Sequence, residues 1–225
     1  MLMCGRFTFT ADPVDIKEAF PWLSVPSQIV PSYNIAPSQA IPVVPNTGSN
    51  QLDFFVWGLI PSWAKDPAIG NRMINARGET LAEKPSFRAA YKRRRCLILA
   101  DGFYEWHKQP GESAKTPYYI TLESQEPFAF AGLWETWYSP DGSEVKSATI
   151  ITTEPNEKIA QLHNRMPVIL PSETYDLWLT PDEVPAAKLD PLLKPYPAAE
   201  MVFHPVSRFV NSPANNTPQC IAPVA

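Results

Sequence analysis

The stretch Cys96-Leu97-Ile98-Leu99-Ala100-Asp101-Gly102-Phe103-Tyr104-Glu105-Trp106 joins an apolar run to a group of aromatic residues around a carboxylate. Aliphatic and aromatic runs bounded by turn-forming residues are typical of β-strands. Similar runs recur along the chain, each bounded by Pro, Gly, Asn or Asp. They predict a β-rich core with strands over residues 6–10, 41–44, 52–57, 96–106, 118–122, 128–133, 148–153 and 201–205.

Turn and helix signals complete the predicted organisation. Asp141-Gly142 predicts a hairpin between residues 134–139 and 145–153, and helical patterns are fewer than strand patterns. No internal repeat or low-complexity linker divides the chain, so we expect one domain over residues 1–225, of the α+β class with a dominant, curved sheet. Helices are predicted over residues 13–19, 86–92, 156–161, 172–179 and 186–193.

Composition favours a compact, loop-rich protein. The 225 residues are 44% hydrophobic, and the 26 prolines are spread along the chain. The three cysteines are far apart, which fits neither a disulfide framework nor zinc-ligand spacing. No long apolar run or signal peptide is visible. We therefore expect a soluble, cytoplasmic protein without a metal, a cofactor or a membrane partner.

Charge is unevenly distributed. The net charge is −4, which argues against nucleic-acid binding through a global positive field. Between Arg72 and Arg95, however, eight basic residues face two acidic ones, so this segment carries +6 and the rest of the chain −10. We expect any phosphate-binding surface to lie on this segment and its spatial neighbours.

Cys4 is a candidate nucleophile, in the stretch Met3-Cys4-Gly5-Arg6-Phe7. If the preceding residues are absent, Cys4 offers both a thiol and an α-amine, which is largely neutral near physiological pH. A 1,2-aminothiol condenses with an aldehyde through a Schiff base and closes to a thiazolidine. The alternative is a small buried hydrophobic residue in the first strand.

Three further clusters carry polar groups suited to chemistry. In residues 71–80, Asn75 could donate hydrogen bonds and Arg77 could bind a phosphate, although turn and surface roles are common for both types. Desolvation of Glu105 would raise its pKa toward neutrality, unless it is a structural ion-pair partner. His163 could move a proton near pH 7, whereas His107 and His204 are expected to be structural.

Six motifs together resemble the SRAP family (SOS response-associated peptidases, or abasic-site processing proteins). The order and spacing match over nearly the whole chain, including a final His-Pro-Val-Ser at 204–207. The motifs are Met-Cys-Gly-Arg-Phe at 3–7, Tyr-Asn-Ile-Ala-Pro at 33–37, Trp-Gly-Leu-Ile-Pro-Ser-Trp at 57–63, Ile-Asn-Ala-Arg-Gly-Glu-Thr at 74–80, Asp-Gly-Phe-Tyr-Glu-Trp at 101–106 and His-Asn-Arg-Met-Pro at 163–167.

The resemblance implies a β-rich α+β fold with sheets curved into a partial barrel and helices outside. It also implies a function: shielding abasic sites in single-stranded DNA through a thiazolidine link to Cys4, which prevents strand breakage. Asn75 would hold the deoxyribose and the Cys4 terminus, Glu105 would handle protons on the amine, and His163 would promote opening of the sugar. The implied DNA contacts are Arg6, Arg77 and Arg165, with Trp63 and Trp106 as base platforms.

The start of the chain departs from this pattern. Met1-Leu2-Met3 places Cys4 in the interior, and methionine excision stops where Leu is next. We expect translation to start at Met3 or, second, the chain to remove its first three residues as an autopeptidase; the remaining alternative is that the form with Met1 is inactive. A latent abasic-site lyase activity is implied as well. On DNA, the protein would be nucleoid-associated, and its replication or repair partners are not given by the sequence.

Two other functions fit many of the same residues. An N-terminal-nucleophile amidase or peptidase would use the freed Cys4 on an acyl carbon, with its own amine as base. A non-catalytic single-strand binder would use the basic and aromatic groups and dispense with Cys4. The basic segment and the tryptophans favour a protein that acts on a DNA lesion over the amidase.

Overall fold

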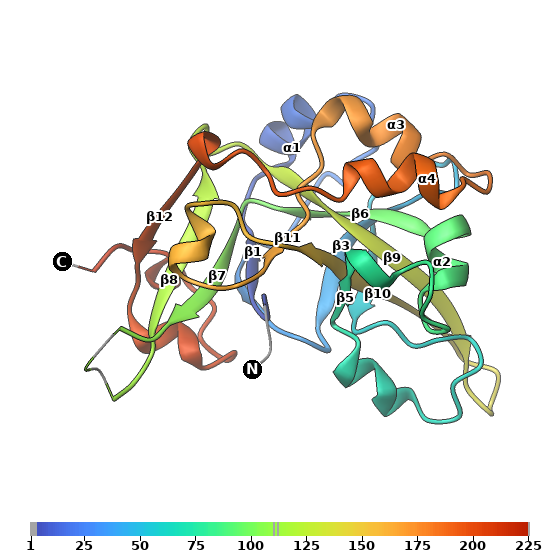
Figure 1. Ribbon diagram of the computed structural model, residues 1–225, viewed down its shortest axis with the longest axis horizontal. Helices are drawn as coiled ribbons and strands as arrows, with labels where there is room; N and C mark the ends of the chain where they lie inside the picture. Colours follow the sequence, from blue (N-terminus) through green and yellow to red (C-terminus); the bar gives the residue numbers. More distant parts are fainter. Residues whose placement is uncertain (1–3, 110, 112, 225) are drawn as a thin grey trace.

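The computed structural model describes residues 4–109, 111 and 113–224, which form two β-sheets with short helices around them (Figure 1). The first sheet has five strands in the order β12-β8-β7-β1-β2, and adjacent strands run antiparallel. These strands are β1 (Phe7–Phe9), β2 (Ser32–Ile35), β7 (Gly102–His107), β8 (Thr116–Leu122) and β12 (Met201–Pro205).

The second sheet closes on itself. Strand β10 pairs with β9 on one side and with β4 on the other, so that the ring β10-β4-β3-β6-β9 is complete. The β10–β4 pairing is parallel and the other four pairings are antiparallel. The expected β-rich α+β fold with curved sheets is confirmed, and its barrel is closed rather than partial. The ring strands are β3 (Ala40–Pro45), β4 (Asp53–Trp57), β6 (Arg95–Ala100), β9 (Phe128–Tyr138) and β10 (Glu144–Thr153).

Two short strands lengthen this sheet beside the second half of β10. Strand β5 (Asn75–Arg77) runs parallel to β10, with Asn75 opposite Ile150. Strand β11 (Met166–Pro167) pairs antiparallel with Thr152 and Thr153. The turn-like segment expected over residues 71–80 therefore contains a strand, because β10 supplies its pairing partner.

Asp101 marks the point where the chain crosses from one sheet to the other. Strand β6 belongs to the closed sheet and β7 to the five-stranded one, so the segment expected over 96–106 is two strands. The Asp101 carboxylate accepts hydrogen bonds from Thr10 Oγ1 (2.8 Å) and from the Ala11 N–H (2.9 Å), and it also accepts from Thr8. These bonds tie the end of β1 to the crossing.

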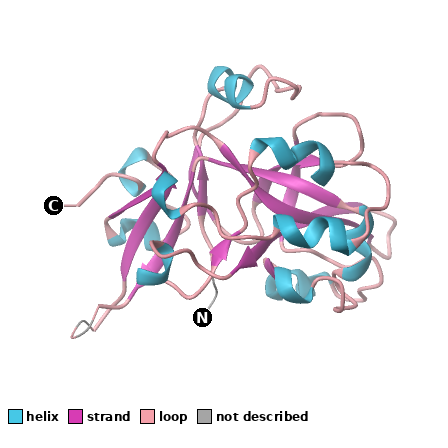
Figure 2. Cartoon of the chain, turned by 45° about the horizontal axis from the view of Figure 1, so that its top comes forward, coloured by secondary structure: helices cyan, strands magenta, loops and turns pink. Residues whose placement is uncertain are grey.

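The helices lie outside the strands (Figure 2). Helix α1 (Pro13–Ala19) has the predicted bounds; Asp12 caps it by accepting from the N–H groups of Val14 and Asp15. None of the helices in the described ranges is long and apolar enough to cross a bilayer. The other helices are α2 (Arg88–Arg93), α3 (Tyr175–Trp178), α4 (Ala186–Leu189) and the 3-10 turns η1 (Pro67–Arg72), η2 (Gly78–Thr80), η3 (Ile159–Gln161), η4 (Ser172–Thr174), η5 (Asp190–Leu192), η6 (Ala198–Glu200), η7 (Arg208–Asn211) and η8 (Pro218–Cys220).

The helix predicted over 156–161 is shorter in the structure. The Asn156 side chain accepts a hydrogen bond from the Ile159 N–H (2.9 Å) as an N-cap does, and only the single 3-10 turn η3 follows. The chain then turns at Leu162 toward β11. This turn carries His163.

Aromatic packing joins the two sheets. Phe7 of β1 is fully buried and meets Trp57 of β4 and Phe130 of β9, with ring centroids 5.1 and 5.9 Å apart. Both contacts are edge-to-face, the arrangement that ring quadrupoles favour. Cys4 belongs to the same cluster, which places the start of β1 between the sheets.

Candidate active site and nucleic-acid interface

Cys4 and Glu105 meet where β1 begins beside β7. The Cys4 N–H donates to Glu105 Oε1 at 2.8 Å. Strict alternation along β1 would place Cys4 on the face of Arg6, yet Cys4 packs with Phe7 in the core. A φ of +38° at Cys4, uncommon outside glycine, breaks the alternation and directs its nitrogen at the carboxyl group.

Glu105 has the proton affinity that acid–base chemistry near neutrality requires. Its side chain is buried, with 3% exposed. Burial raises the pKa of Glu105 to about 7, although the hydrogen bond from the Cys4 N–H and the positive charge of Lys115 act against this rise. Glu105 can therefore both give and take a proton at physiological pH.

The Cys4 thiol is held as a neutral group. The residue is completely buried. Burial raises the pKa of the Cys4 thiol well above its usual value, and the nearby negative charge of Glu105 raises it further. The thiol of Cys4 therefore rests in its protonated form. The residues before Cys4, including the expected start at Met3, lie outside the described part of the chain.

Asn75 reaches Cys4 from the opposite sheet. Its Nδ2 lies 3.4 Å from the Cys4 carbonyl oxygen. Two bonds to the Ile74 carbonyl place β5 there: Trp57 Nε1 donates at 2.9 Å and the Ile150 N–H at 3.1 Å. The backbone of Cys4 therefore bonds to both Asn75 and Glu105, although 101 residues separate Cys4 from Glu105.

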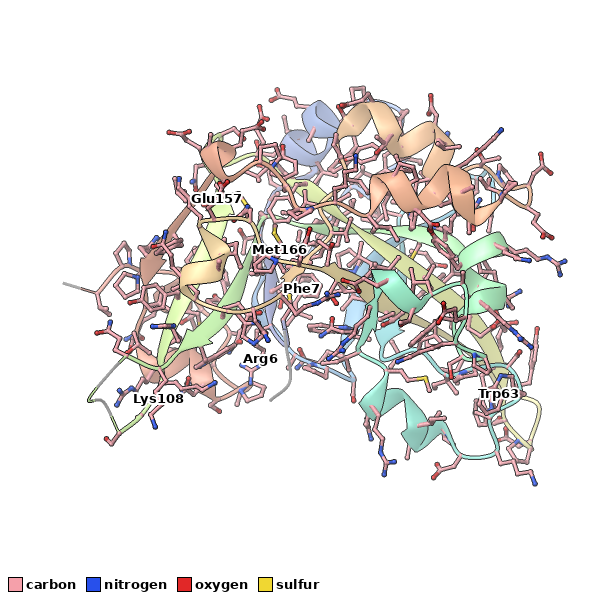
Figure 3. All side chains as sticks on the ribbon, viewed as in Figure 1. Arg6, Phe7, Trp63, Lys108, Glu157 and Met166 are labelled. Atoms are coloured by element: carbon pink, nitrogen blue, oxygen red, sulfur yellow. The ribbon has the colours of Figure 1, made fainter. Side chains whose placement is uncertain are left out.

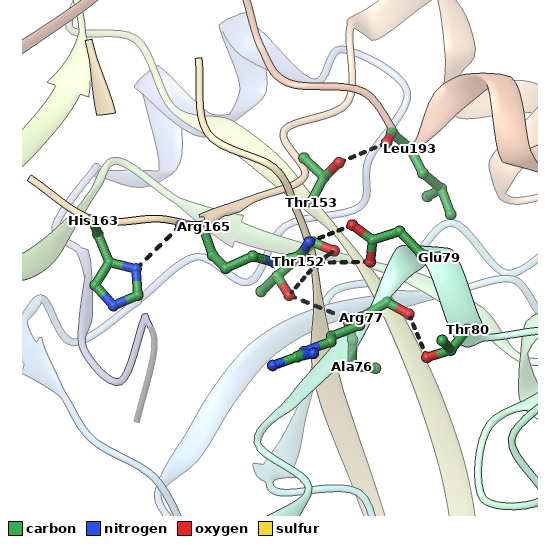
Figure 4. Close-up of polar contacts among 9 residues, drawn as sticks. All are labelled: Ala76, Arg77, Glu79, Thr80, Thr152, Thr153, His163, Arg165 and Leu193. Atoms are coloured by element: carbon green, nitrogen blue, oxygen red, sulfur yellow. Dashed lines mark hydrogen bonds and ion pairs between the residues drawn. The ribbon is translucent and has the colours of Figure 1, made fainter. Parts of the chain in front are cut away.

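His163 lies in the turn between η3 and β11. The Arg165 N–H donates to its Nδ1 at 3.2 Å, so the neutral imidazole carries its proton on Nε2 (Figure 4). Burial lowers the pKa of His163, and the charge of Lys115 lowers it further. The ring is thus a neutral group that offers an N–H for donation from Nε2.

Arg165 is engaged within the protein. Its guanidinium binds both carboxylate oxygens of Glu79 and donates to the Thr152 carbonyl oxygen at 2.6 Å (Figure 4). Only 14% of its side chain is exposed, and its proximity keeps the pKa of Glu79 below the usual range. Arg77, by contrast, is exposed, and in Figure 4 its guanidinium extends toward the side on which His163 lies.

Arg6 and Trp106 form a bracket with the C-terminal segment. Arg6 donates to Asn34 Oδ1 (2.7 Å) and to the carbonyl oxygens of Val210 (2.8 Å) and Asn211 (3.1 Å). Its guanidinium lies 5.8 Å from the centre of the Trp106 ring, and Trp106 Nε1 donates to Asn211 Oδ1 at 2.8 Å. Much of the donor capacity of Arg6 is thus used inside the protein, to hold Trp106.

Trp63 lies apart from these residues. Figure 3 labels it far from Arg6 and Phe7, beyond the barrel. The ring is 60% exposed and lines a shallow pocket of about 250 Å³ with Lys65 and Arg72. The structure therefore does not bring Trp63 to Cys4. A DNA strand would have to extend well past the site to meet it.

The basic segment expected to bind phosphate is partly structural. Arg95 is fully buried and donates to the carbonyl oxygens of Trp178 (2.9 Å) and Thr180 (2.6 Å). Arg94 pairs with Glu135 at 2.8 Å, and Arg93 with Glu183 at 2.9 Å. The local excess of positive charge in the sequence is therefore larger than the excess left for a ligand.

Sequence reasoning missed four contributors to this region. Lys115, whose charge acts on Glu105 and His163, follows a β-hairpin turn and belongs to no motif. Asn34 and Glu79 lie in the quoted motifs, but only the fold reveals their arginine partners, 28 and 86 residues away. Asn211 lies in a segment without a pattern. Nothing in the described ranges gathers three His, Cys, Asp or Glu side chains as metal ligands would be gathered.

Comparison with known proteins gives a consistent result. The profile of the SOS response associated peptidase (SRAP) family matches residues 3–213. The abasic site processing protein YoqW of Bacillus subtilis is 50% identical over 222 residues, which cover 97% of this chain and 99% of YoqW. The abasic site processing protein HMCES of Xenopus tropicalis is 34% identical over 267 residues, covering 99% of this chain and 78% of HMCES.

Solved structures share the fold. The crystal structure of a protein from Bacteroides thetaiotaomicron superposes with a TM-score of 0.87 at 27% identity, covering 99% of this chain and 100% of that one. A protein from Bordetella bronchiseptica superposes with a TM-score of 0.77 at 25% identity, covering 91% of this chain and 100% of the other. The arrangement of two sheets is thus common to these chains.

Proposed function

This chain belongs to the SRAP family, and from that membership we propose that it processes abasic sites in single-stranded DNA by linking them covalently to Cys4. Relatives that cover nearly the whole chain carry the name abasic site processing protein. The observation that best supports a covalent route is the 2.8 Å hydrogen bond from the Cys4 nitrogen to Glu105. It places a proton-exchanging group on the atom that would attack the lesion.

The proposed reaction begins with opening of the abasic sugar. The closed form is a hemiacetal, and as its C1′–O4′ bond breaks the ring oxygen gains a proton while the C1′ hydroxyl loses one. The Nε2–H of His163 is suited to donate a hydrogen bond to that oxygen, because Nδ1 is occupied by the Arg165 N–H. The product is the free aldehyde at C1′.

The next steps use both nucleophiles of Cys4. Once the residues before Cys4 are removed, its α-amine adds to C1′ to give a carbinolamine. Protonated Glu105 gives its proton to the departing hydroxyl, which leaves as water, and a Schiff base forms. The thiol then adds to C1′ and its proton returns to Glu105, while the amine proton stays in the ring. The balance is aldehyde plus aminothiol giving thiazolidine plus one water.

The surrounding residues suggest how DNA is held. Arg77 is exposed beside Asn75 and suited to a phosphate, and Trp106 presents a partly exposed ring held by Arg6. Arg165 can reach a phosphate only in exchange for Glu79. Trp63 would serve a base farther along the strand. The raised pKa of the Cys4 thiol supports the proposed order, in which the amine attacks first and the thiol second.

The test uses two forms of the protein and a single-stranded oligonucleotide with one abasic site. One form starts at Met3, so that methionine removal exposes Cys4, and the other starts at Met1. The first should give a species retarded on a denaturing gel, with a mass equal to protein plus DNA minus one water. Cys4→Ala should abolish it.

A lack of any link, from protein whose mass shows Cys4 at its terminus, would overturn the proposal and favour an N-terminal-nucleophile amidase. If the link forms on the Met3-start protein alone, the free amine is required. If the Met1-start protein also forms it, the mass of that protein shows whether it has removed its own first residues.

A further inference from the structure

His107 connects the strand of Glu105 to the turn of His163. It follows Glu105 by two residues on β7, so the two side chains lie on one face of the strand. Its Nδ1 lies 3.2 Å from the carbonyl oxygen of Leu162. A carbonyl only accepts hydrogen bonds, so Nδ1 carries the proton. The ring of Tyr118 on β8 packs edge-on against His107, with centroids 6.4 Å apart, and limits its rotation.

The same turn is held at its other end by the closed sheet. Arg165 donates to the Thr152 carbonyl oxygen, and Met166 pairs with Thr153 of β10. Within the turn, the Leu162 and His163 N–H groups both bond to the Ile159 carbonyl at 2.8 Å. The segment from 162 to 166 is thus attached to β10 on one side and, through His107, to β7 on the other.

We propose that His107 is a positioning residue that fixes His163 relative to Glu105. Glu105 belongs to the five-stranded sheet, while the turn of His163 is anchored on the barrel. The hydrogen bond from His107 to the Leu162 carbonyl joins the five-stranded sheet to this turn, and Leu162 is the residue directly before His163. The inference rests on the proposed function, because positioning matters only if His163 and Glu105 act on one substrate.

The experiment compares three single variants by their first-order linking rate at saturating DNA. His107→Leu removes the donor and should slow linking about ten-fold, because small displacements of a catalytic group have large effects on rate. His107→Asn keeps a donor near the position of Nδ1 and should restore most of the rate. His204→Leu is the matched control: His204 bonds the Ile221 carbonyl (2.9 Å) and packs on Tyr119 (5.7 Å) away from Cys4, and its rate should be unchanged.

A double variant separates positioning from general loss of stability. If His107 acts through His163, adding His107→Leu to His163→Ala should change the rate less than two-fold, since the group being positioned is already absent. Equal slowing in both backgrounds, or a wild-type rate in folded His107→Leu, would overturn the inference.

An independent readout does not need the reaction. Long-range ¹H–¹⁵N spectra report which nitrogen of His163 is protonated, and they should show the Nε2–H form in the wild type and in His204→Leu. In His107→Leu the preference for that form should fall. Unchanged His163 signals would count against positioning even if no link formed, whereas a shift without any link would leave the positioning intact and contradict the proposed function.

Discussion

At the scale of single residues, the site depends on one carboxyl group in an unusual place. Glu105 is buried beside a backbone nitrogen, and the positive charge of Lys115 offsets only part of the effect of that burial. A hydrogen bond from a neutral N–H stabilises a carboxylate less than an ion pair does. This explains why burial prevails and why the pKa of Glu105 reaches about 7.

The raised pKa makes stability depend on pH. The folded pKa of Glu105, about 7, exceeds its ordinary value of 4.5, so the folded state binds the proton more tightly than the unfolded state. This tighter proton binding adds to the free energy of unfolding. The contribution is fully present below pH 4.5, and roughly 3 kcal/mol of it is lost as the pH rises through 7. Glu105→Gln should therefore be more stable than the wild type at pH 8, with the difference shrinking toward pH 5. Melting temperatures at both values check this; a difference independent of pH would contradict it.

Cys4 carries a second prediction, about the order of attack. A Schiff base that cannot close to a thiazolidine persists and invites β-elimination of the 3′ phosphate. Processed Cys4→Ser protein should therefore cleave an abasic oligonucleotide slowly and be trapped on it by borohydride, while Cys4→Ala tests whether the amine alone suffices. Absence of incision and of trapping in both variants would argue against attack by the amine first.

At the scale of elements, the position of β5 depends on a close approach of two glycines. Gly58 follows β4 with a φ of +128°, and a Cβ built on it would lie 2.6 Å from the Gly70 carbonyl oxygen. The Leu59 N–H bonds to the Met73 carbonyl at 3.1 Å just before β5 begins. Contact between these two backbone segments thus decides where Asn75 stands.

Gly58→Ala should therefore damage both the fold and the site. Strained backbone and the clash with Gly70 together should cost about 2 kcal/mol, or roughly 4–8 °C in melting temperature. Linking should slow as well, because Asn75 moves with β5. Gly142→Ala is the control: its φ is +85°, but its Cβ would meet nothing within 4 Å, so strain acts there without a clash. Equal losses from the two variants would show that the contact itself contributes nothing.

The same elements show how far the sequence leads. Apolar and aromatic runs located β1, β3, β4, β6 to β10 and β12, and Asp141-Gly142 located the β9–β10 hairpin, because these patterns are local. Strand β5 was missed because Asn75-Ala76-Arg77 has no strand-like composition and depends on parallel pairing with β10. Motif resemblance selected Cys4, Asn75 and Glu105, which the fold brings together. It could not show that Arg165 faces Glu79 or that Trp63 lies apart.

At the scale of the whole molecule, the proposed function requires a protein of negative net charge to bind DNA, which is also negatively charged. With a net charge of −4 and several basic residues already paired, attraction for DNA must come from a few exposed groups near the site. We therefore expect modest affinity and strong dependence on salt, with little binding to intact duplex.

The salt dependence identifies those groups. Each phosphate contact in single-stranded DNA contributes about 0.7 to the slope of log affinity against log salt. Arg77→Gln should lower the slope by about that amount on any sequence, measured by fluorescence anisotropy on single strands without an abasic site so that no link forms. Arg88→Gln, which removes an exposed arginine of α2, should leave the slope unchanged. An equal effect from both would place the DNA along α2 as well.

The bracket around Trp106 also has a consequence for the timing of protein synthesis. Arg6 leaves the ribosome 204 and 205 residues before its partners Val210 and Asn211, and Asn34 bonds to Val210, Ser212 and Asn215. The bracket around Trp106 therefore forms only after residues 210–215 have emerged from the ribosome. A nascent chain that has not yet reached residue 210 would therefore carry Cys4 without the completed bracket around Trp106.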